Sequence, residues 1–315
     1  MMSPETAWAS AIFWFYLYLA AGLLSTAGIL IFVLSRYARL QMSHARDAYR
    51  GWLVMIPVVF LCLFLGREAT ILFFAVLTSW AFYEFARATG LANERWLTTA
   101  VHVGIAACAL VSLLPDATTD GQGWYGMFMA LPVFAIATIV IIPILQDRAG
   151  GQLQMVALAI LGFIYIGWMF LHVGFLANSR NAYGYLLFIV FAVEVNDVAA
   201  YTFGKIFGQR PLRPHISPNK TWGGALGALA VSLVLPWSLR FSFPHFSPWQ
   251  LLLTGLIVGI GGQLGDLSIS MIKRDAGVKD MGTAIRGHGG ILDRIDSVIY
   301  VAPLFFHMTR YYHGL

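Results

Sequence analysis

Residues 8–34 read WASAIFWFYLYLAAGLLSTAGILIFVL, a run of twenty-seven residues without one charged side chain. A helix needs about 20 mostly apolar residues to cross a membrane, because each residue advances the helix by about 1.5 Å. The run is longer than the apolar part of a cleaved signal peptide, and residues 1–7 contain no Lys or Arg. We therefore expect the first membrane span here.

Comparable apolar stretches recur along the chain. Hydrophobic residues make up 59% of the 315 positions and charged residues 11%, against roughly a quarter charged in soluble domains. A soluble fold of this length could not bury so much apolar surface, so we expect an all-α, polytopic bundle of transmembrane helices. The apolar windows predict about ten spans, with nine as the alternative count, near residues 8–35, 52–66, 69–86, 97–115, 124–145, 154–177, 183–203, 222–239, 249–270 and 295–312.

The chain is expected to form two transmembrane regions. Residues 1–150 would hold about five spans, and residues 151–315 would hold the others together with the polar motifs. The second and third spans adjoin at Arg67, which predicts a tight helical hairpin. Cys62 and Cys108 both lie in apolar runs, so they indicate structural thiols and give no metal-binding spacing.

Basic residues predict the orientation. With the N-terminus outside, only four of the 20 Lys and Arg residues fall in outer segments, namely Arg67, Arg180, Arg240 and Arg310. The remaining sixteen then lie on the cytoplasmic side, as the positive-inside rule requires. The arginines between residues 36 and 50 are interpreted as topology determinants beside anionic lipid headgroups. We therefore expect an integral protein of the bacterial inner membrane, with both ends outside and the polar motifs facing the cytoplasm.

The first polar motif, EVNDVAAYTFGK at residues 194–205, lies within an expected span. Asp197, Tyr201 and Lys205 recur every four residues, so they share one face of a helix. An ionisable group inside the membrane is expensive to bury and is a functional candidate by default. The alternative is a buried structural pair of Asp197 with Lys205.

A basic loop, GQRPLRPHISPNKTWGG, follows at residues 208–224. Ser217 and Thr221 flank Lys220, and glycines follow where the next span begins. Hydroxyl groups, backbone N–H groups at a helix start and a lysine together suit a phosphate chain. The glycine-rich spacing of a Walker A loop is absent, and basic loops at membrane surfaces are common, so the signal is moderate.

The densest polar segment is GGQLGDLSISMIKRDAGVKDMGTAIRGHGGILDRID, residues 261–296. Asp266 and Ser270 lie one helical turn apart, and Asp293 and Asp296 open the last span on one face. Carboxylates without a Cys or His cluster suit a hard cation such as Mg²⁺, which bridges carboxylates to nucleotide phosphates. The same segment contains basic residues that suit nucleotide phosphates, namely Lys273, Arg274 and Lys279. A solvated connecting loop is the plainer alternative, and it does not explain this density of Gly, Asp, Lys and Arg.

These motifs resemble the signature of the phosphatidate cytidylyltransferases. The resemblance is strong over roughly residues 190–300 and weak before them, and two positions, Gly223 and Arg286, depart from the family pattern. The matching motifs are Asp197-x-x-Ala200-Tyr201, Ser217-Pro218-x-Lys220-Thr221-Trp222, Gly265-Asp266, Ser270-x-x-Lys273-Arg274, Lys279-Asp280-x-Gly282 and Gly287-His288-Gly289-Gly290-Ile291-x-Asp293-Arg294-Ile295-Asp296.

The resemblance implies an activity and roles for these residues. A phosphatidate oxygen would attack the α-phosphorus of CTP and expel pyrophosphate, giving CDP-diacylglycerol for phospholipid synthesis. Asp266 and Asp293 would hold Mg²⁺, alone or with a second cation, and Lys273 and Lys279 would complete the catalytic set. Phosphate contacts are expected from Ser217, Lys220, Thr221, Arg274, His288 and Arg294. Supporting roles are expected for Asp197, Tyr201, Ser270, Asp280 and Asp296.

The expected partners are CTP, phosphatidate or a similar lipid phosphate, and the membrane lipids. A homodimer is left open, and no nucleic acid is expected. One alternative is a related enzyme that uses CTP with another lipid phosphate. Another, from a different class, is an ion-coupled transporter, which predicts charges spread along a path through the membrane. Here the charges gather at the expected cytoplasmic ends of the spans.

Cysteine labelling in intact cells tests the predicted topology. A cysteine at Thr283, in the glycine-rich loop, should react with an impermeant maleimide only after the membrane is permeabilised. A cysteine at Asp120, in an expected outer loop, should react in intact cells and serves as the matched control. Labelling of the Thr283 site from outside would contradict the orientation.

Overall fold

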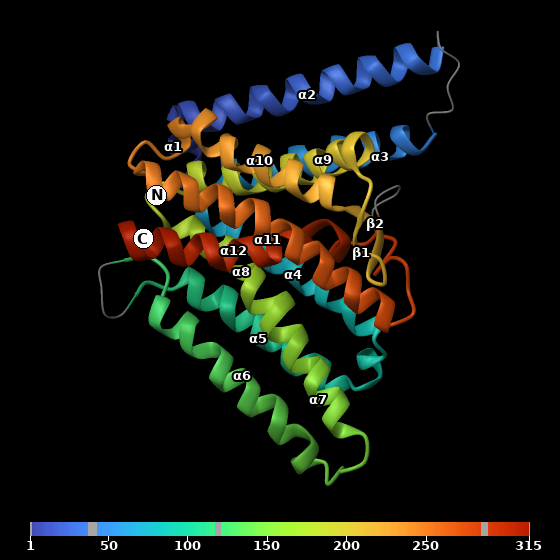
Figure 1. The fold of residues 1–315 in the computed structure, drawn as a ribbon. Coiled ribbons are helices and arrows are strands. Elements are labelled where there is room, and N and C mark those ends of the chain that lie inside the picture. The colour runs from blue at the N-terminus through green and yellow to red at the C-terminus, as the bar shows by residue number, and fades with distance from the viewer. Residues whose placement is uncertain (1, 37–42, 117–120, 285–288, 315) are drawn as a thin grey trace.

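The computed structural model describes residues 2–36, 43–116, 121–284 and 289–314, and helices account for 81% of the structure. Figure 1 shows a bundle of long helices with one short hairpin of strands at one end. The predicted polytopic helical bundle is therefore confirmed.

The first half of the chain consists of long helices joined by short connections. The elements are α1 (Pro4–Ala9), α2 (Ala11–Arg36), α3 (Ser43–Leu65), α4 (Arg67–Ala88), the 3₁₀ turn η1 (Leu91–Asn93), α5 (Arg95–Leu113) and α6 (Tyr125–Leu145).

The second half contains the hairpin and the longest helices. A rod of α7 (Gln152–Leu161), the π-helical η2 (Gly162–Met169), α8 (Phe170–Phe175) and η3 (Leu176–Asn178) comes first, then α9 (Ala182–Phe207), β1 (Pro211–Arg213) and β2 (Ser217–Thr221). The remaining elements are α10 (Trp222–Ser238), η4 (Arg240–Ser242), α11 (Pro248–Asp275) and α12 (Leu292–His313).

Each of the ten predicted spans falls on a helix. Among the described residues, eight helices are long and apolar enough to cross a membrane. Helix α10, at 17 residues, is shorter, and α12, whose first turns carry Asp293, Arg294 and Asp296, is not among the eight. The structure therefore gives eight clear spans. The other two predicted spans correspond to α10 and α12, which are not both long enough and apolar enough to be counted with the eight.

Two predicted spans were too short at one end. Helix α3 begins at Ser43, nine residues before the predicted span, and its first turns carry Arg46 and Arg50. Helix α11 continues to Asp275, beyond the predicted end at residue 270. The reason is the same in both cases: a helix continues past the point where its side chains stop being apolar, so an apolar window ends too soon.

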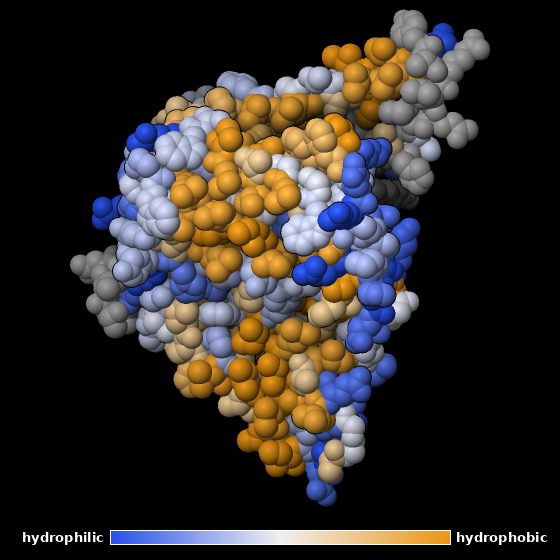
Figure 2. Space-filling view, viewed as in Figure 1, coloured by the Kyte–Doolittle hydropathy of each residue, from blue (hydrophilic) through white to orange (hydrophobic). Residues whose placement is uncertain are grey.

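The two chain ends lie at one end of the bundle, and the β1–β2 hairpin lies at the opposite end (Figure 1). On the face seen in Figure 2, hydrophilic residues line the hairpin end and apolar residues cover much of the bundle between the two ends. The predicted arrangement, with both chain ends on one side and the polar motifs on the other, agrees with this layout.

The predicted tight hairpin at Arg67 is confirmed. Only Gly66 separates α3 from α4, and its φ of 109° lies in a region that glycine adopts easily. The buried Arg67 guanidinium donates to Asn178 Oδ1 at 2.6 Å and to the carbonyl oxygens of Ser112 and Leu113 at 3.0 and 2.8 Å. These contacts fasten the α3–α4 turn to the ends of α5 and η3.

Helices α9 and α10 approach closely because α10 begins with glycines. A Cβ atom on Gly224 would lie 2.5 Å from the Ala200 carbonyl oxygen, and one on Gly223 would lie 2.6 Å from that of Phe207. Small residues allow transmembrane helix backbones to come this near. The glycine at position 223, which departs from the family pattern, therefore has a packing reason in this chain.

The basic segment that was predicted as a loop is in part an antiparallel hairpin. Pro211 of β1 lies opposite Thr221 of β2, and the Thr221 hydroxyl caps α10 by accepting a hydrogen bond from the Gly224 amide at 3.1 Å. The Arg274 Nε donates to the Ile216 carbonyl oxygen at 3.2 Å, which joins the hairpin tip to the end of α11. The strands are too short and too rich in proline to show an alternating pattern.

Gly224→Ala tests the close packing of α9 and α10. The added methyl group meets backbone that cannot move aside, and such overpacking typically lowers the free energy of unfolding by about 1–3 kcal/mol. Thermal unfolding in detergent measures the loss. In the control Gly22→Ala, the new methyl group has nothing within 4 Å. An equal effect in the two variants would contradict the packing argument.

Candidate active site

Four aspartates from three helices gather near the hairpin end of the bundle. They are Asp197 of α9, Asp266 of α11, and Asp293 and Asp296 of α12. Asp296 is buried and lies within electrostatic reach of both Asp266 and Asp197. So many carboxylates inside a helical bundle require counter-charges or hydrogen-bond donors, since an unpaired buried charge is strongly destabilising.

The hairpin supplies the first counter-charge. Lys220 of β2 places its Nζ 2.5 Å from Asp266 Oδ2, and both side chains are more than two-thirds buried. Ser270, one turn further along α11, donates its hydroxyl to Asp266 Oδ1 at 3.1 Å. The Asp266 carboxylate is thus held between a strand and its own helix.

Asp293 is held by a lysine and by two backbone amides. The Lys273 Nζ lies 2.9 Å from Asp293 Oδ1, while Oδ2 accepts hydrogen bonds from the Met281 and Gly290 amides at 2.9 and 3.0 Å. Met281 and Gly290 both lie in the glycine-rich loop, residues 276–291, which connects α11 to α12. One carboxylate therefore joins the end of α11, two points of this loop and the start of α12.

Glu84 of α4 is a second carboxylate that holds the same loop. Its Oε2 accepts the Leu292 amide hydrogen at 2.9 Å, at the first residue of α12. Gly282 and Gly290 pack so closely against the Glu84 carboxylate that a Cβ atom on either glycine would collide with it. Glu84 was not among the predicted site residues, although an acidic side chain inside the predicted span 69–86 was the signal that could have indicated it.

Arg294 lies beside the aspartates. Its Nε atom is buried and has no hydrogen-bond partner in the described part of the chain, and Asp197 and Glu194 are within its electrostatic reach. Asp197 has only long contacts with the Ser297 hydroxyl, at 3.4 and 3.5 Å. Because buried donors in folded proteins are nearly always paired, the Arg294 Nε is suited to an anionic ligand.

The predicted face of Asp197, Tyr201 and Lys205 is not a single site. The Tyr201 side chain is 64% exposed, and the Lys205 Nζ lies over its ring at 4.6 Å from the centroid. The structural alternative, a pair of Asp197 with Lys205, is therefore not formed. Asp197 turns toward Ser297 and the aspartate group instead.

Three further predicted residues lie in the hairpin and in the glycine-rich loop. Lys279 and Asp280 are exposed in the glycine-rich loop, and Ser217 begins β2. His288 and Arg286 lie outside the described residues.

The π-helical η2 contributes a further polar group that the sequence did not indicate. The Tyr165 hydroxyl is buried near Ser268 and within electrostatic reach of Asp266 and Asp296. A single tyrosine in an apolar run carries no periodic signal, so only the folded structure reveals its position.

The described side chains do not form a complete metal site by themselves. Among the described residues, no group of three or more His, Cys, Asp or Glu side chains is arranged to hold one. Mg²⁺ is typically bound by one or two carboxylates and completes its coordination with water and substrate phosphates. Asp266 and Asp293 are two such carboxylates, and in this structure a lysine pairs with each of them.

Comparisons with known proteins agree with this chemistry. A model of the cytidylyltransferase family matches residues 46–312. The protein YnbB of Escherichia coli (strain K12), whose name carries no activity, is 32% identical over 251 residues, which cover 78% of this chain and 80% of the relative. Phosphatidate cytidylyltransferases of Staphylococcus haemolyticus (strain JCSC1435) and Staphylococcus aureus (strain COL) are 35% and 36% identical, over 63% and 58% of this chain and 75% and 69% of the relatives.

Glu84→Ala tests whether this carboxylate holds the loop. The change leaves the buried Leu292 amide without its acceptor, at about 1–3 kcal/mol, so we expect faster amide hydrogen exchange at Met281 and Leu292. Enzymatic turnover should fall at least tenfold, and Glu84→Gln, which keeps an acceptor oxygen, should lose less. The control is Glu68→Ala, because this side chain is 67% exposed and its partner Arg67 has other acceptors. Unchanged amide hydrogen exchange at Met281 and Leu292 in Glu84→Ala would show that Glu84 does not hold the loop.

Proposed function

The chain belongs to the cytidylyltransferase family, and we propose that it transfers the cytidylyl group of CTP to phosphatidate, giving CDP-diacylglycerol and pyrophosphate. The family match over residues 46–312 carries this proposal. The name of the staphylococcal relatives supports phosphatidate as the acceptor. A transporter is not favoured, since the matched relatives with a named activity are transferases.

The charges of the site suit two anionic reactants. A phosphate oxygen of the lipid forms the new bond to the α-phosphorus of CTP, and the bond from that phosphorus to the pyrophosphate oxygen breaks. A phosphate monoester is already nucleophilic near neutral pH, so the reaction needs no general base. Its main requirements are neutralisation and alignment of the phosphates, which Lys220, Lys273 and Arg294 can supply.

Asp266 and Asp293 would hold Mg²⁺, which stabilises negative charge on the phosphates of the nucleotide when bound. Lys220 and Lys273 neutralise these two carboxylates in the present structure. With a cation on the carboxylates, the two lysines would be free to contact the phosphates of the substrates.

We place the site at the cytoplasmic face of the bacterial inner membrane. The polar motifs lie at the hairpin end, opposite both chain ends (Figure 1). The excess of basic residues in the segments expected at that end supports this orientation.

A transfer assay tests the function. Purified protein in detergent receives Mg²⁺, CTP labelled at the α-phosphate, and one lipid at a time from a panel of phosphatidate, a polyprenyl phosphate and a phosphate-free diacylglycerol. We expect label in the lipid fraction with phosphatidate and none with diacylglycerol. Transfer to the polyprenyl phosphate alone would replace phosphatidate as the acceptor, and no transfer to any lipid would contradict the function.

Asp266→Asn tests the assignment of the cation site. The amide keeps the shape of the side chain but loses its charge, so we expect turnover to fall at least 100-fold, or about 2.7 kcal/mol of transition-state stabilisation. The control Asp47→Asn changes an exposed aspartate that pairs with Arg50 on α3. Turnover close to that of the unmodified protein in Asp266→Asn would exclude this carboxylate as a required ligand.

A further inference from the structure

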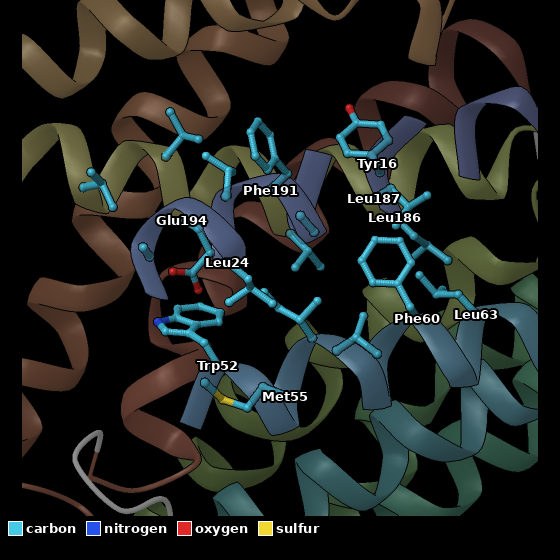
Figure 3. Close-up of a pocket in the computed structure, with 18 of the residues that line it drawn as sticks. Tyr16, Leu24, Trp52, Met55, Phe60, Leu63, Leu186, Leu187, Phe191 and Glu194 are labelled. Carbon is cyan, nitrogen blue, oxygen red and sulfur yellow. The ribbon is translucent and has the colours of Figure 1, made fainter. Parts of the chain in front are cut away.

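A cavity of about 520 Å³ lies between α2, α3 and α9 (Figure 3). Apolar side chains from all three helices line it, including Leu24, Phe60, Leu187 and Phe191. Glu194 is the only charged residue among its described lining residues, and Figure 3 shows its carboxylate beside Trp52 at one end of the cavity. The cavity is therefore apolar along most of its length and polar at one end.

The dimensions of the cavity suit an acyl chain. Along α9 its lining runs from Leu186 to Val198, a separation of twelve steps, which at 1.5 Å per step is about 18 Å. One leaflet of a bilayer, half of a core about 30 Å thick, is about 15 Å deep. The volume also lies within the range of about 300–1,000 Å³ that is usual for ligand pockets.

The polar end of the cavity lies next to the candidate active site. Glu194 and Asp197 are one turn apart on α9, and the charges of Asp197 and Arg294 both act on Glu194. The Arg294 Nε is one of several buried polar atoms that lack a hydrogen-bond partner in the described chain, and it belongs to a side chain that is always positively charged. A lipid whose chain occupies the cavity would thus bring its headgroup to a cation that has room for a phosphate.

The cavity can be reached from the membrane. Leu23 and Val198, which line it, are 54% and 65% exposed, on helices that flank the opening. Helix α2 precedes the part of the chain that the family model matches, which begins at residue 46. It is joined to the bundle near the outer end, where the Tyr16 hydroxyl lies 2.9 Å from that of Ser242.

We propose that this cavity binds one acyl chain of the lipid phosphate substrate and that α2, as one of its walls, helps to select chain length. The proposal rests on the proposed function, because it assigns a binding site for the acceptor of that reaction. Lipid tails are as apolar as the lining, so contact with the lining alone would not select a substrate. Selection comes from the fixed depth of the cavity, since the headgroup must also reach Arg294.

Val190→Trp tests the cavity by filling its middle from α9, and Leu24→Trp fills it independently from α2. Phosphatidates with eight-carbon and eighteen-carbon chains are compared as acceptors by steady-state kinetics in mixed micelles. In both variants we expect kcat/KM for the long-chain lipid to fall at least tenfold relative to the short-chain lipid. The KM for CTP should stay within twofold. The matched control is Val76→Trp, which adds the same side chain at an exposed position on α4 outside the cavity.

The outcomes separate the two proposals. If the unmodified protein converts neither lipid, the proposed function fails. If it converts both, and either folded variant keeps the chain preference of the Val76→Trp control, the cavity is not the acyl-chain site. If neither variant folds, phosphatidate with a photoreactive group near its chain end is cross-linked to the unmodified protein. Label in peptides of α2, α3 or α9, or at Phe74 of α4, which also lines the cavity, then supports the site, and label confined to other parts of the chain overturns it.

Discussion

The structure depends on one constraint, which is that charges placed inside an apolar helical bundle must have partners there. Removing a charge from water is expensive, and an unpaired buried charge destabilises a protein by several kcal/mol, about 3–5 kcal/mol in typical cases. Lys220 with Asp266 and Lys273 with Asp293 meet this requirement. Glu84 meets it with a backbone amide. Because the partners come from α4, α11, α12, the hairpin and the glycine-rich loop, the same contacts that satisfy the charges also assemble the site.

This origin of the site explains how it can serve anionic substrates. Charges that were permanently paired could not bind a triphosphate. A lysine in a lysine–aspartate pair, in contrast, can leave its aspartate and bind a phosphate. Arg294 has a buried Nε that lacks a hydrogen-bond partner among the described residues, which leaves room for an anion. The glycines contribute by letting backbones and carboxylates come close, as Gly282 and Gly290 do against Glu84. The apolar cavity beside α9 then connects the charged group to the lipid phase.

Much of the fold could be predicted from the sequence, because a long apolar stretch directly indicates a helix that lies within the membrane. The helical bundle and the turn at Arg67 were predicted correctly, and the Lys273 and Asp293 side chains form an ion pair. Contacts between distant segments were harder to predict. Glu84 lies more than 200 residues before Leu292, and no local pattern links them. The β hairpin was missed because its strands are short, and the cavity because it arises only when three helices are packed.

The most direct test of this account is a double-mutant cycle between Lys220 and Asp266. Lys220→Met, Asp266→Asn and the double variant are compared with the unmodified protein by their free energies of unfolding in detergent, without nucleotide or added Mg²⁺. Each single change leaves one charge without its partner, so the account predicts that the double variant loses less stability than the two single losses combined. The expected difference is about 0.5–3 kcal/mol, the range for residues in direct contact. Losses that add to within about 0.5 kcal/mol would show that the two charges do not stabilise one another, and would contradict the account.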